Sequence, residues 1–221
     1  MNDLTPFLER YALLALEKQQ KLLRLSEGQF VELDLDGGVA RFGRSLAAPF
    51  QVLGTESDNS LTWLWAWAEE HTEMPEQLMR SSREMKAWLE QNGLRELTQP
   101  SLDVDLADGT QLSCIAAEVC RASGFYRDPY EGGALFLLLF SDQIDRQPGF
   151  TLDELVGSLL DLGSRYPVRH RTAVASYLRS RGRSFEERTD SLQAQLATGE
   201  PIIAEFNADG SVRTINGTFV G

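Results

Sequence analysis

Residues 30–42 read Phe-Val-Glu-Leu-Asp-Leu-Asp-Gly-Gly-Val-Ala-Arg-Phe, and this stretch decides the fold class. Apolar and polar residues alternate from Phe30 to Leu35, which is the period of a β-strand with one buried face. Asp36-Gly37-Gly38 then supplies a turn that tolerates positive φ, and residues 39–42 return as a second strand. We therefore expect an antiparallel hairpin at this point.

The same pattern continues along the chain. Residues 50–55 and 61–68 read as two more strands, separated by the polar turn 56–60. Four sequential strands with short connections imply an antiparallel meander. A second hairpin is expected from residues 125–127 and 134–140, and its second strand is apolar on both faces, as a central strand would be.

Helical patterns lie on both sides of this meander. Thr5-Pro6 begins a helix that runs to about Ser26, with Gly28 just beyond its end. Further helices are expected at 75–91 and at 112–122, the latter preceded by a capping box from Asp108 to Gln111. The predicted fold is α+β, with an antiparallel sheet of about six strands covered by helices.

The C-terminal part is predicted to form a lobe of helices and a hairpin. Helices are expected at 151–162, 167–181 and 185–197, followed by a hairpin that pairs 202–206 with 211–215. We expect residues 1–221 to form a single compact unit, with possible sub-lobes at 1–142 (helix plus antiparallel sheet) and 150–221 (helices plus hairpin).

Composition excludes several classes of protein. Hydrophobic residues make up 42% and charged residues 24% of the chain, as in globular domains. A net charge of −12 makes nucleic acid an unlikely partner and disfavours binding to anionic lipid. The longest apolar run, 134–140, is far shorter than a membrane span, and the first residues carry no basic segment of a signal peptide. We therefore expect a cytoplasmic location and no membrane partner.

No metal site or cofactor site is predicted. Cys114 and Cys120 stand six residues apart in a helical stretch without a nearby histidine, so we expect two buried, reduced thiols. Asp103, Asp105 and Asp108 imitate a calcium loop, but alanine and aspartate stand where a ligand and the glycine are needed. Asp108 is better explained as a helix cap.

The most distinctive stretch is Thr62-Trp63-Leu64-Trp65-Ala66-Trp67-Ala68, preceded by Leu53-Gly54-Thr55. On a strand, the three indoles share one face, and Thr62, Leu64 and Ala66 share the other. Trp63, Trp65 and Trp67 are the candidate ligand-binding residues, because a row of indoles can stack a planar or sugar ligand. The alternative is that these indoles form the core under the helices.

This motif also carries a resemblance. The pattern Leu-Gly-Thr followed by Thr-Trp-Leu-Trp-Ala-Trp-Ala resembles a family of uncharacterised bacterial proteins of about this length. The resemblance extends to residues 33–38, to Pro167 with His170-Arg171, and to residues 206–210, so it covers most of the chain. It implies one structural unit and no established activity.

Asp34 and Asp36 imitate the paired aspartates of haloacid-dehalogenase-type phosphatases. Those enzymes need a helix between successive parallel strands, and too few residues separate Asp36 from Phe50 for one. A plain hairpin turn explains both aspartates better. His170 shares a helical face with Val174, Tyr177 and Leu178, so we expect a half-buried position for it.

Seven arginines between residues 165 and 188 form the one basic segment of the chain: Arg165, Arg169, Arg171, Arg179, Arg181, Arg183 and Arg188. No aromatic platform lies between them, so we expect most to be solvated or paired with carboxylates of this protein.

Two functions remain open at this point, and a third, nucleic-acid binding through the arginine segment, needs those side chains to line one continuous surface. The first is a non-catalytic binding or protein-interaction module, with a basic protein as the possible partner. The second is an enzyme with an unfamiliar hydrolase-like site in a cleft near Asp34, Asp36 and His170. The absence of a recognisable catalytic motif favours the first.

Overall fold

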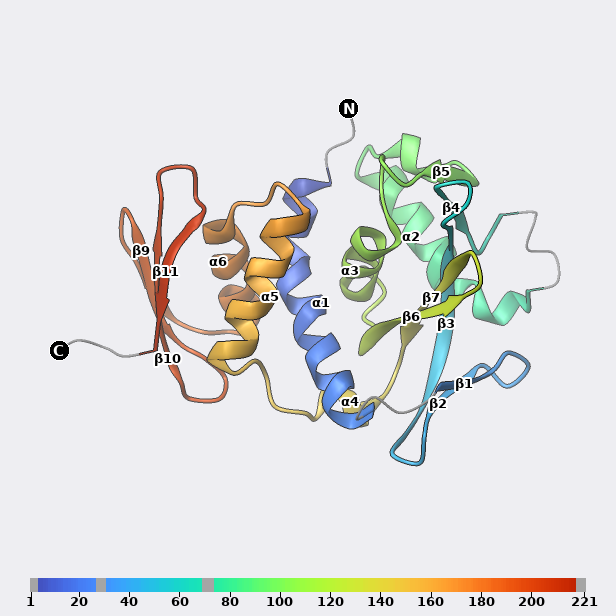
Figure 1. The fold of residues 1–221 in the computed structure, drawn as a ribbon, viewed down its shortest axis with the longest axis horizontal. Coiled ribbons are helices and arrows are strands. Elements are labelled where there is room, and N and C mark those ends of the chain that lie inside the picture. Colours follow the sequence, from blue (N-terminus) through green and yellow to red (C-terminus); the bar gives the residue numbers. More distant parts are fainter. Residues whose placement is uncertain (1–3, 27–30, 69–73, 218–221) are drawn as a thin grey trace. The chain divides into compact units, whose positions relative to one another are not determined.

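A computed structural model describes residues 4–26, 31–68 and 74–217 of the chain (Figure 1). It divides into two compact units, of which unit 1 is built around residues 22–146 and unit 2 consists of residues 5–21 and 147–221. Helix α1 (Thr5–Ser26) is continuous and contributes to both. The expectation of a single compact unit stays a prediction.

Unit 1 contains a seven-stranded antiparallel sheet, which confirms the predicted α+β class. Its strands are β1 (Val31–Asp34), β2 (Val39–Phe42), β3 (Leu46–Ser57), β4 (Thr62–Trp65), β5 (Ser101–Asp103), β6 (Gly124–Tyr130) and β7 (Gly133–Leu139). The long strand β3 organises the sheet, because its first half pairs with β2 and its second half with β4, while β7 pairs with it from Phe50 to Ser57. β1 and β6 extend the sheet beyond β2 and β7, and β5 extends it beyond β4.

The helices of unit 1 that follow α1 are short, and one of them carries the cap that the sequence predicts. A 3-10 turn (Glu76–Leu78) precedes α2 (Arg80–Gln91), so the helix expected at 75–91 is interrupted at Met79. A second 3-10 turn (Arg95–Thr98) follows α2. α3 (Gly109–Val119) begins with the predicted capping box between Asp108 and Gln111, and α4 (Asp142–Asp145) is a single turn. The end predicted for the first helix at Gly28 lies outside the described residues.

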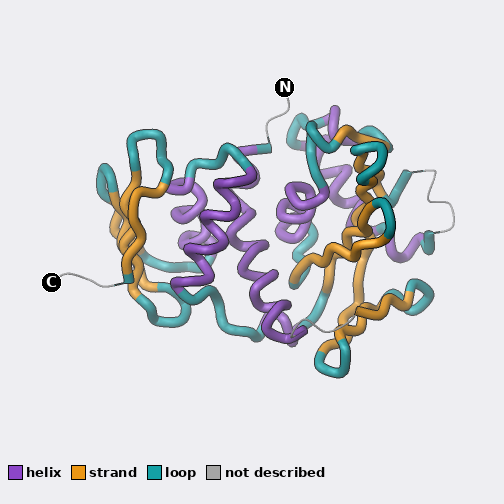
Figure 2. Tube along the Cα trace, viewed as in Figure 1, coloured by secondary structure: helices purple, strands orange, loops and turns teal. Residues whose placement is uncertain are grey.

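Unit 2 joins most of α1 to α5 (Leu152–Arg165), α6 (His170–Ser180) and a four-stranded antiparallel sheet, drawn in orange with its helices in purple in Figure 2. The strands are β8 (Phe185–Glu187), β9 (Ser191–Gln195), β10 (Pro201–Phe206) and β11 (Val212–Asn216), in the order β11-β10-β9-β8. The C-terminal lobe of helices and a hairpin is confirmed.

The helix expected at 185–197 was wrong, because this segment is the β8–β9 hairpin. Leu192, Ala194 and Leu196 are buried at every second position, which is a strand period, and the Arg188 N–H closes the turn on the Ser191 carbonyl at 2.9 Å. The strand period and the turn residues Thr189-Asp190 outweighed helix propensity. Among the described residues, no helix is both long and apolar enough to cross a membrane.

Candidate functional site

The two faces of the unit 1 sheet differ in burial. Cross-strand partners in an antiparallel sheet point to the same face, so the register assigns each residue to a face. One row joins Trp63 through Glu56 to Ala134, and the next joins Trp65 through Gly54 to Phe136. Trp63, Trp65, Ala134 and Phe136 are buried, so this is the core face of the sheet.

The predicted ligand-binding tryptophans lie on this core face. Trp63 and Trp65 have no exposed surface, and their rings meet edge to face with centroids 5.4 Å apart. Trp63 also contacts Phe136 at 5.3 Å, and the Trp65 indole donates to the Leu97 carbonyl at 2.9 Å. The structure therefore corrects the groove for these two indoles, because core packing leaves them no surface to offer a ligand.

Trp67 is half-buried and lies beyond the end of β4. Its ring stacks on Trp65 with centroids 6.4 Å apart, and the Lys86 ammonium lies 3.9 Å from the centre of its ring. A ligand-binding role for Trp67 stays a prediction.

The opposite face of the same strands is open at one end of β7, whereas farther along β7 it is closed, because Leu137 and Leu139 are buried in a core cluster with Phe50 and Val52 and Leu135 packs against that cluster. One row runs Asp128, Leu135, Thr55, Leu64, Ser101, and the next runs Tyr130, Gly133, Ser57, Thr62, Asp103. Gly133 apart, every one of these residues is half-buried or exposed. We call these two rows the open sheet face. Five strands at about 4.8 Å make it about 19 Å wide.

Backbone contacts hold the loops at the edge of this face together. The Asp58 N–H donates to the Gly132 carbonyl at 2.9 Å, which joins the β3–β4 turn to the β6–β7 hairpin. The Val104 N–H donates to the Leu61 carbonyl at 3.0 Å, which joins the same turn to the segment after β5. Figure 1 shows β4, β5 and β7 on one side of the unit.

Large apolar side chains are exposed on these joined loops. Leu61 is 60% exposed, Tyr130 is 50% exposed and Leu106 is 36% exposed. Leu61 also has φ of 52°, a left-handed conformation that costs a branched side chain about 1 kcal/mol or more. Neither its exposure nor its backbone conformation makes leucine a favourable residue here for folding.

The charge on and around the open sheet face is entirely acidic. Asp103 and Asp128 lie on the face, and Asp58, Asp105 and Glu131 lie on the joined loops. None of these five carboxylates forms an ion pair with another described residue. Partial burial raises the pKa of Asp128, and burial together with the Asp128 charge raises the pKa of Tyr126 on the same strand.

The aspartates of the alternative enzyme site serve the β1–β2 turn. The Asp34 carboxylate accepts the Gly37 N–H at 2.8 Å, and the Asp36 carbonyl accepts from the Gln77 amide at 3.3 Å. Both side chains are exposed, and Gly38 in the same turn has φ of 65°. The contacts of these aspartates are those of a hairpin turn.

His170 belongs to unit 2 and has contacts of its own there. Its Nδ1 accepts the Val212 N–H at 3.1 Å, so the proton of the neutral ring is on Nε2. Its ring packs on Gly163, where a Cβ would come within 1.9 Å of Nε2. Burial lowers the pKa of His170 despite the Asp209 charge. These contacts tie α6 to α5 and β11. His71 lies outside the described residues.

The arginine segment is mostly paired within unit 2, as expected. Six of its seven members form an ion pair, and the acidic partners are Asp161, Glu9, Glu187, Glu17 and Glu186. Glu9 is 3% exposed and accepts a bidentate pair of hydrogen bonds from Arg169 at 2.9 Å each. The Glu9 carboxylate raises the pKa of Arg169 through these hydrogen bonds.

Glu17 is the centre of a buried charge cluster in unit 2. Its carboxylate is 1% exposed and accepts from the Tyr177 hydroxyl, while Arg181 and Lys21 form ion pairs with it. The Phe150 N–H donates to it at 3.3 Å. Burial and the Glu17 charge raise the pKa of Tyr177, so its hydroxyl keeps its proton.

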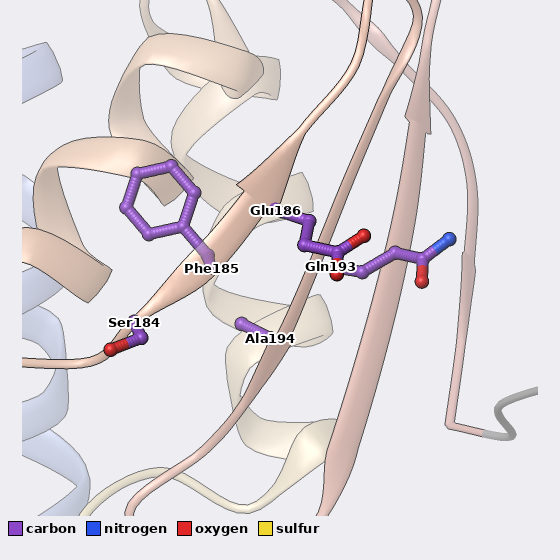
Figure 3. Close-up of a pocket in the computed structure, with 5 residues that line it drawn as sticks. All are labelled: Ser184, Phe185, Glu186, Gln193 and Ala194. Atoms are coloured by element: carbon purple, nitrogen blue, oxygen red, sulfur yellow. The ribbon is translucent and has the colours of Figure 1, made fainter.

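Three pockets lie among the described residues, one of which, of about 420 Å³, is in unit 1 and is lined by Glu90, Arg95, Thr98 and Gln99. In unit 2, a pocket of about 400 Å³ lies along β8 and β9 and is lined by Ser184, Phe185, Glu186, Gln193 and Ala194 (Figure 3). In unit 1, a pocket of about 210 Å³ lies between Phe50, Arg80, Glu84 and Cys120. Burial and the Glu84 charge raise the pKa of the Cys120 thiol to about 12, so it is not a nucleophile at neutral pH.

Metal ligands do not gather in the part of the chain that the structure describes. No group of three or more histidine, cysteine, aspartate or glutamate side chains there could hold an ion. The Asp103 carboxylate accepts the Asp105 N–H at 2.9 Å, and the Asp108 carboxylate caps α3. Both are local backbone contacts.

Sequence reasoning found strand β4 and the division of its side chains between two faces. Alternation places Thr62 and Leu64 opposite the tryptophans. It does not say which face the helices cover. The neighbours from β5, β6 and β7 depend on register over long sequence separations, and no local signal in the sequence reports that register.

Comparison with known proteins gives one match. A family described as a family of unknown function, DUF6882, matches residues 5–142, which is more than half of the chain and includes the tryptophan motif. Residues 170–171 and 206–210, to which the resemblance extends, lie outside this match. No curated protein and no solved structure matches the chain. The chain therefore belongs to the DUF6882 family of unknown function.

Proposed function

We propose that this protein is a non-catalytic protein-interaction module of the bacterial cytoplasm, and that its partner docks on the open sheet face of unit 1. The observation that carries the proposal is a face five strands wide whose side chains stay half-buried or exposed. The core face of the same strands is packed with aromatic rings.

The chemistry of the open sheet face suits a protein partner. Leu64, Leu135 and Tyr130 provide apolar surface, and Thr55, Ser57 and Thr62 provide hydroxyls that can donate or accept. Interface cores combine aromatic and apolar residues in this way, with a polar rim. Small-molecule sites are concave, and none of the described pockets is lined by residues of this face.

Leu61 adds a second argument. A left-handed position at a hairpin turn favours glycine or asparagine, and leucine gains nothing there from burial because most of its surface is exposed. Because neither the backbone conformation nor burial favours leucine at position 61, a contact with a partner accounts for it better. Its neighbours Ser57 and Ser60 hold the turn through hydrogen bonds at 3.2 and 2.7 Å.

The test compares partner capture by matched surface variants. Tagged wild type, Tyr130→Ala and Leu160→Ala are used to capture proteins from the native lysate, and the bound proteins are quantified by mass spectrometry. Leu160 is the control because it is 51% exposed, close to the 50% of Tyr130, but lies on α5 of unit 2.

We expect a stoichiometric partner that wild type and Leu160→Ala retain and that Tyr130→Ala loses at least tenfold, as hot-spot aromatic residues do. Equal retention by both variants, or no stoichiometric partner of the wild type, would overturn the proposal.

A further inference from the structure

We infer that the segment docking on the open sheet face is cationic, with lysine or arginine side chains flanking at least one apolar side chain. This inference rests on the proposed function and names the chemistry of the partner. Its basis is the juxtaposition of exposed apolar side chains with carboxylates that have no cation of their own.

The charges of the chain are divided unequally between the units. Residues 22–146 carry 21 acidic and 10 basic side chains, whereas the residues of unit 2 carry 11 of each. Unit 2 is therefore neutral as a whole, and the acidity of the protein resides in unit 1. A cationic partner is attracted to one unit specifically.

Within unit 1, the open sheet face lacks compensating cations. Its two rows contain two aspartates and no basic residue. Arg127, the basic residue nearest in sequence to Asp128, lies on the core side of β6, with its guanidinium 6.0 Å from the centre of the Phe136 ring. A cation for Asp128 must therefore come from outside the described residues.

The position of Asp128 makes such a cation valuable. Its carboxylate is half-buried beside Tyr126 and Leu135, where water solvates it incompletely. A lysine or arginine placed against it supplies the missing counter-charge in a partly dry setting, where the interaction is stronger than at an exposed site. Asp103 at the far end of the second row offers a second contact.

Apolar contacts set the position of the partner between these charges. Leu135, Thr55 and Leu64 separate Asp128 from the β5 edge, so the two aspartates flank an apolar centre. An extended segment with cationic residues on both sides of an apolar residue matches this arrangement. Exposed Leu61 and Tyr130 border the same surface.

The test uses defined peptides and residue-specific detection. A capped peptide that repeats Lys-Ser-Leu-Ser, so that lysine and leucine lie on the same side of an extended chain, is titrated into the isotope-labelled full chain, and amide chemical shifts are recorded. Two analogues carry glutamine or glutamate in place of every lysine. We expect the lysine peptide to shift the amides of residues 55–57, 62–64, 101–103 and 128–135, with an affinity that falls as salt rises.

Charge variants distinguish a contact with one carboxylate from attraction to the net charge of unit 1. Asp128→Asn is expected to lower the affinity for the lysine peptide about fivefold, and Asp103→Asn by a similar factor. The control Asp36→Asn removes the same single charge from the exposed β1–β2 turn and is expected to change affinity less than twofold.

The outcomes distinguish this inference from the proposed function. If the glutamine peptide shifts the same amides with the same affinity as the lysine peptide, the inference of a cationic partner is wrong, but the proposed docking face is retained. If the shifts spread over unit 1, or Asp36→Asn weakens binding as much as Asp128→Asn, the inference is overturned. If no peptide shifts the face and Tyr130→Ala retains every partner, both fail.

Discussion

The two units of this protein differ in whether their carboxylates form ion pairs. In unit 2 the buried carboxylates Glu9 and Glu17 are each held by arginine, and six of seven clustered arginines are paired. In unit 1 the carboxylates around the open sheet face have no such partner. The difference indicates which charges the fold itself uses and which it leaves available.

Burial supports the same division. Glu9 and Glu17 of unit 2 are almost without exposed surface, so desolvation makes their pairing obligatory. The unpaired carboxylates around the open sheet face of unit 1 are half-buried or exposed, so water solvates them in the absence of a partner. Mutations in the two units should therefore separate stability from binding.

The largest effect is expected from Glu17→Gln. It leaves Arg181 and Lys21 without a counter-charge in a buried site, which costs about 3 to 5 kcal/mol of unfolding free energy. Urea unfolding followed by circular dichroism measures this loss. Glu186→Gln is the control, because its pair with Arg188 is 3.6 Å long and exposed, and less than about 0.5 kcal/mol is expected. Equal losses would remove the distinction between buried and surface pairs.

Gly54→Ala tests the close packing of the core face of the unit 1 sheet. A Cβ at residue 54 would lie 2.4 Å from the Leu64 carbonyl and 2.4 Å from the Trp63 ring, so overpacking should cost about 2 kcal/mol. The matched change Gly157→Ala meets nothing within 4 Å on α5 and should stabilise by about 0.5 to 1 kcal/mol. Thermal unfolding of both variants measures these changes in stability. A Gly54→Ala variant more stable than the wild type would contradict the close packing.

Leu61→Gly should raise stability and lower binding together. Relief of the left-handed leucine is expected to add about 0.5 to 1 kcal/mol to the unfolding free energy. Arg121→Gly is the control, because Arg121 has φ of 54° at the end of α3, away from the open sheet face, and should stabilise without changing peptide affinity. Calorimetry and the lysine-peptide titration test the two effects. A loss of stability in Leu61→Gly would mean that the leucine serves the fold.

Asp128→Asn gives the smallest effect and a defined pH dependence. The folded state raises the pKa of Asp128, so the folded protein holds this proton more tightly than the unfolded chain does. Unfolding free energy is therefore lost as pH rises through the raised pKa. The variant should be slightly more stable than wild type at pH 7 and equal to it at pH 3, below the unfolded value. Unfolding curves at both pH values check this, and a less stable variant at pH 7 would contradict it.

Much of the unit 1 fold could be predicted from local sequence signals. The hairpin at 31–42 follows from alternation and from Gly37-Gly38, and the capping box at Asp108 follows from side-chain chemistry. The helix predicted at 185–197 was wrong because the local sequence there is compatible with both a helix and a short hairpin. The packing of Leu192 and Ala194 selects the hairpin.

The candidate site was less accessible to prediction. Tyr130 and Asp103 come to one row only through three successive strand pairings, and the sequence does not encode such long-range register locally. The pairing of Glu17 with Arg181 depends equally on tertiary contacts. The excess of acid could be counted from the sequence, but its separation into one unit could not.

The route of α1 has a consequence for biosynthesis. Glu9 and Glu17 leave the ribosome before Arg169 and Tyr177, which they contact and which follow 160 residues later. The two carboxylates of the nascent helix therefore cannot be buried with their partners until the segment that contains Arg169 and Tyr177 has been translated. Unit 2 is completed last although it contains the first helix. A nascent chain stalled at residue 142, where the family match ends, would expose α1 without the segment that neutralises it.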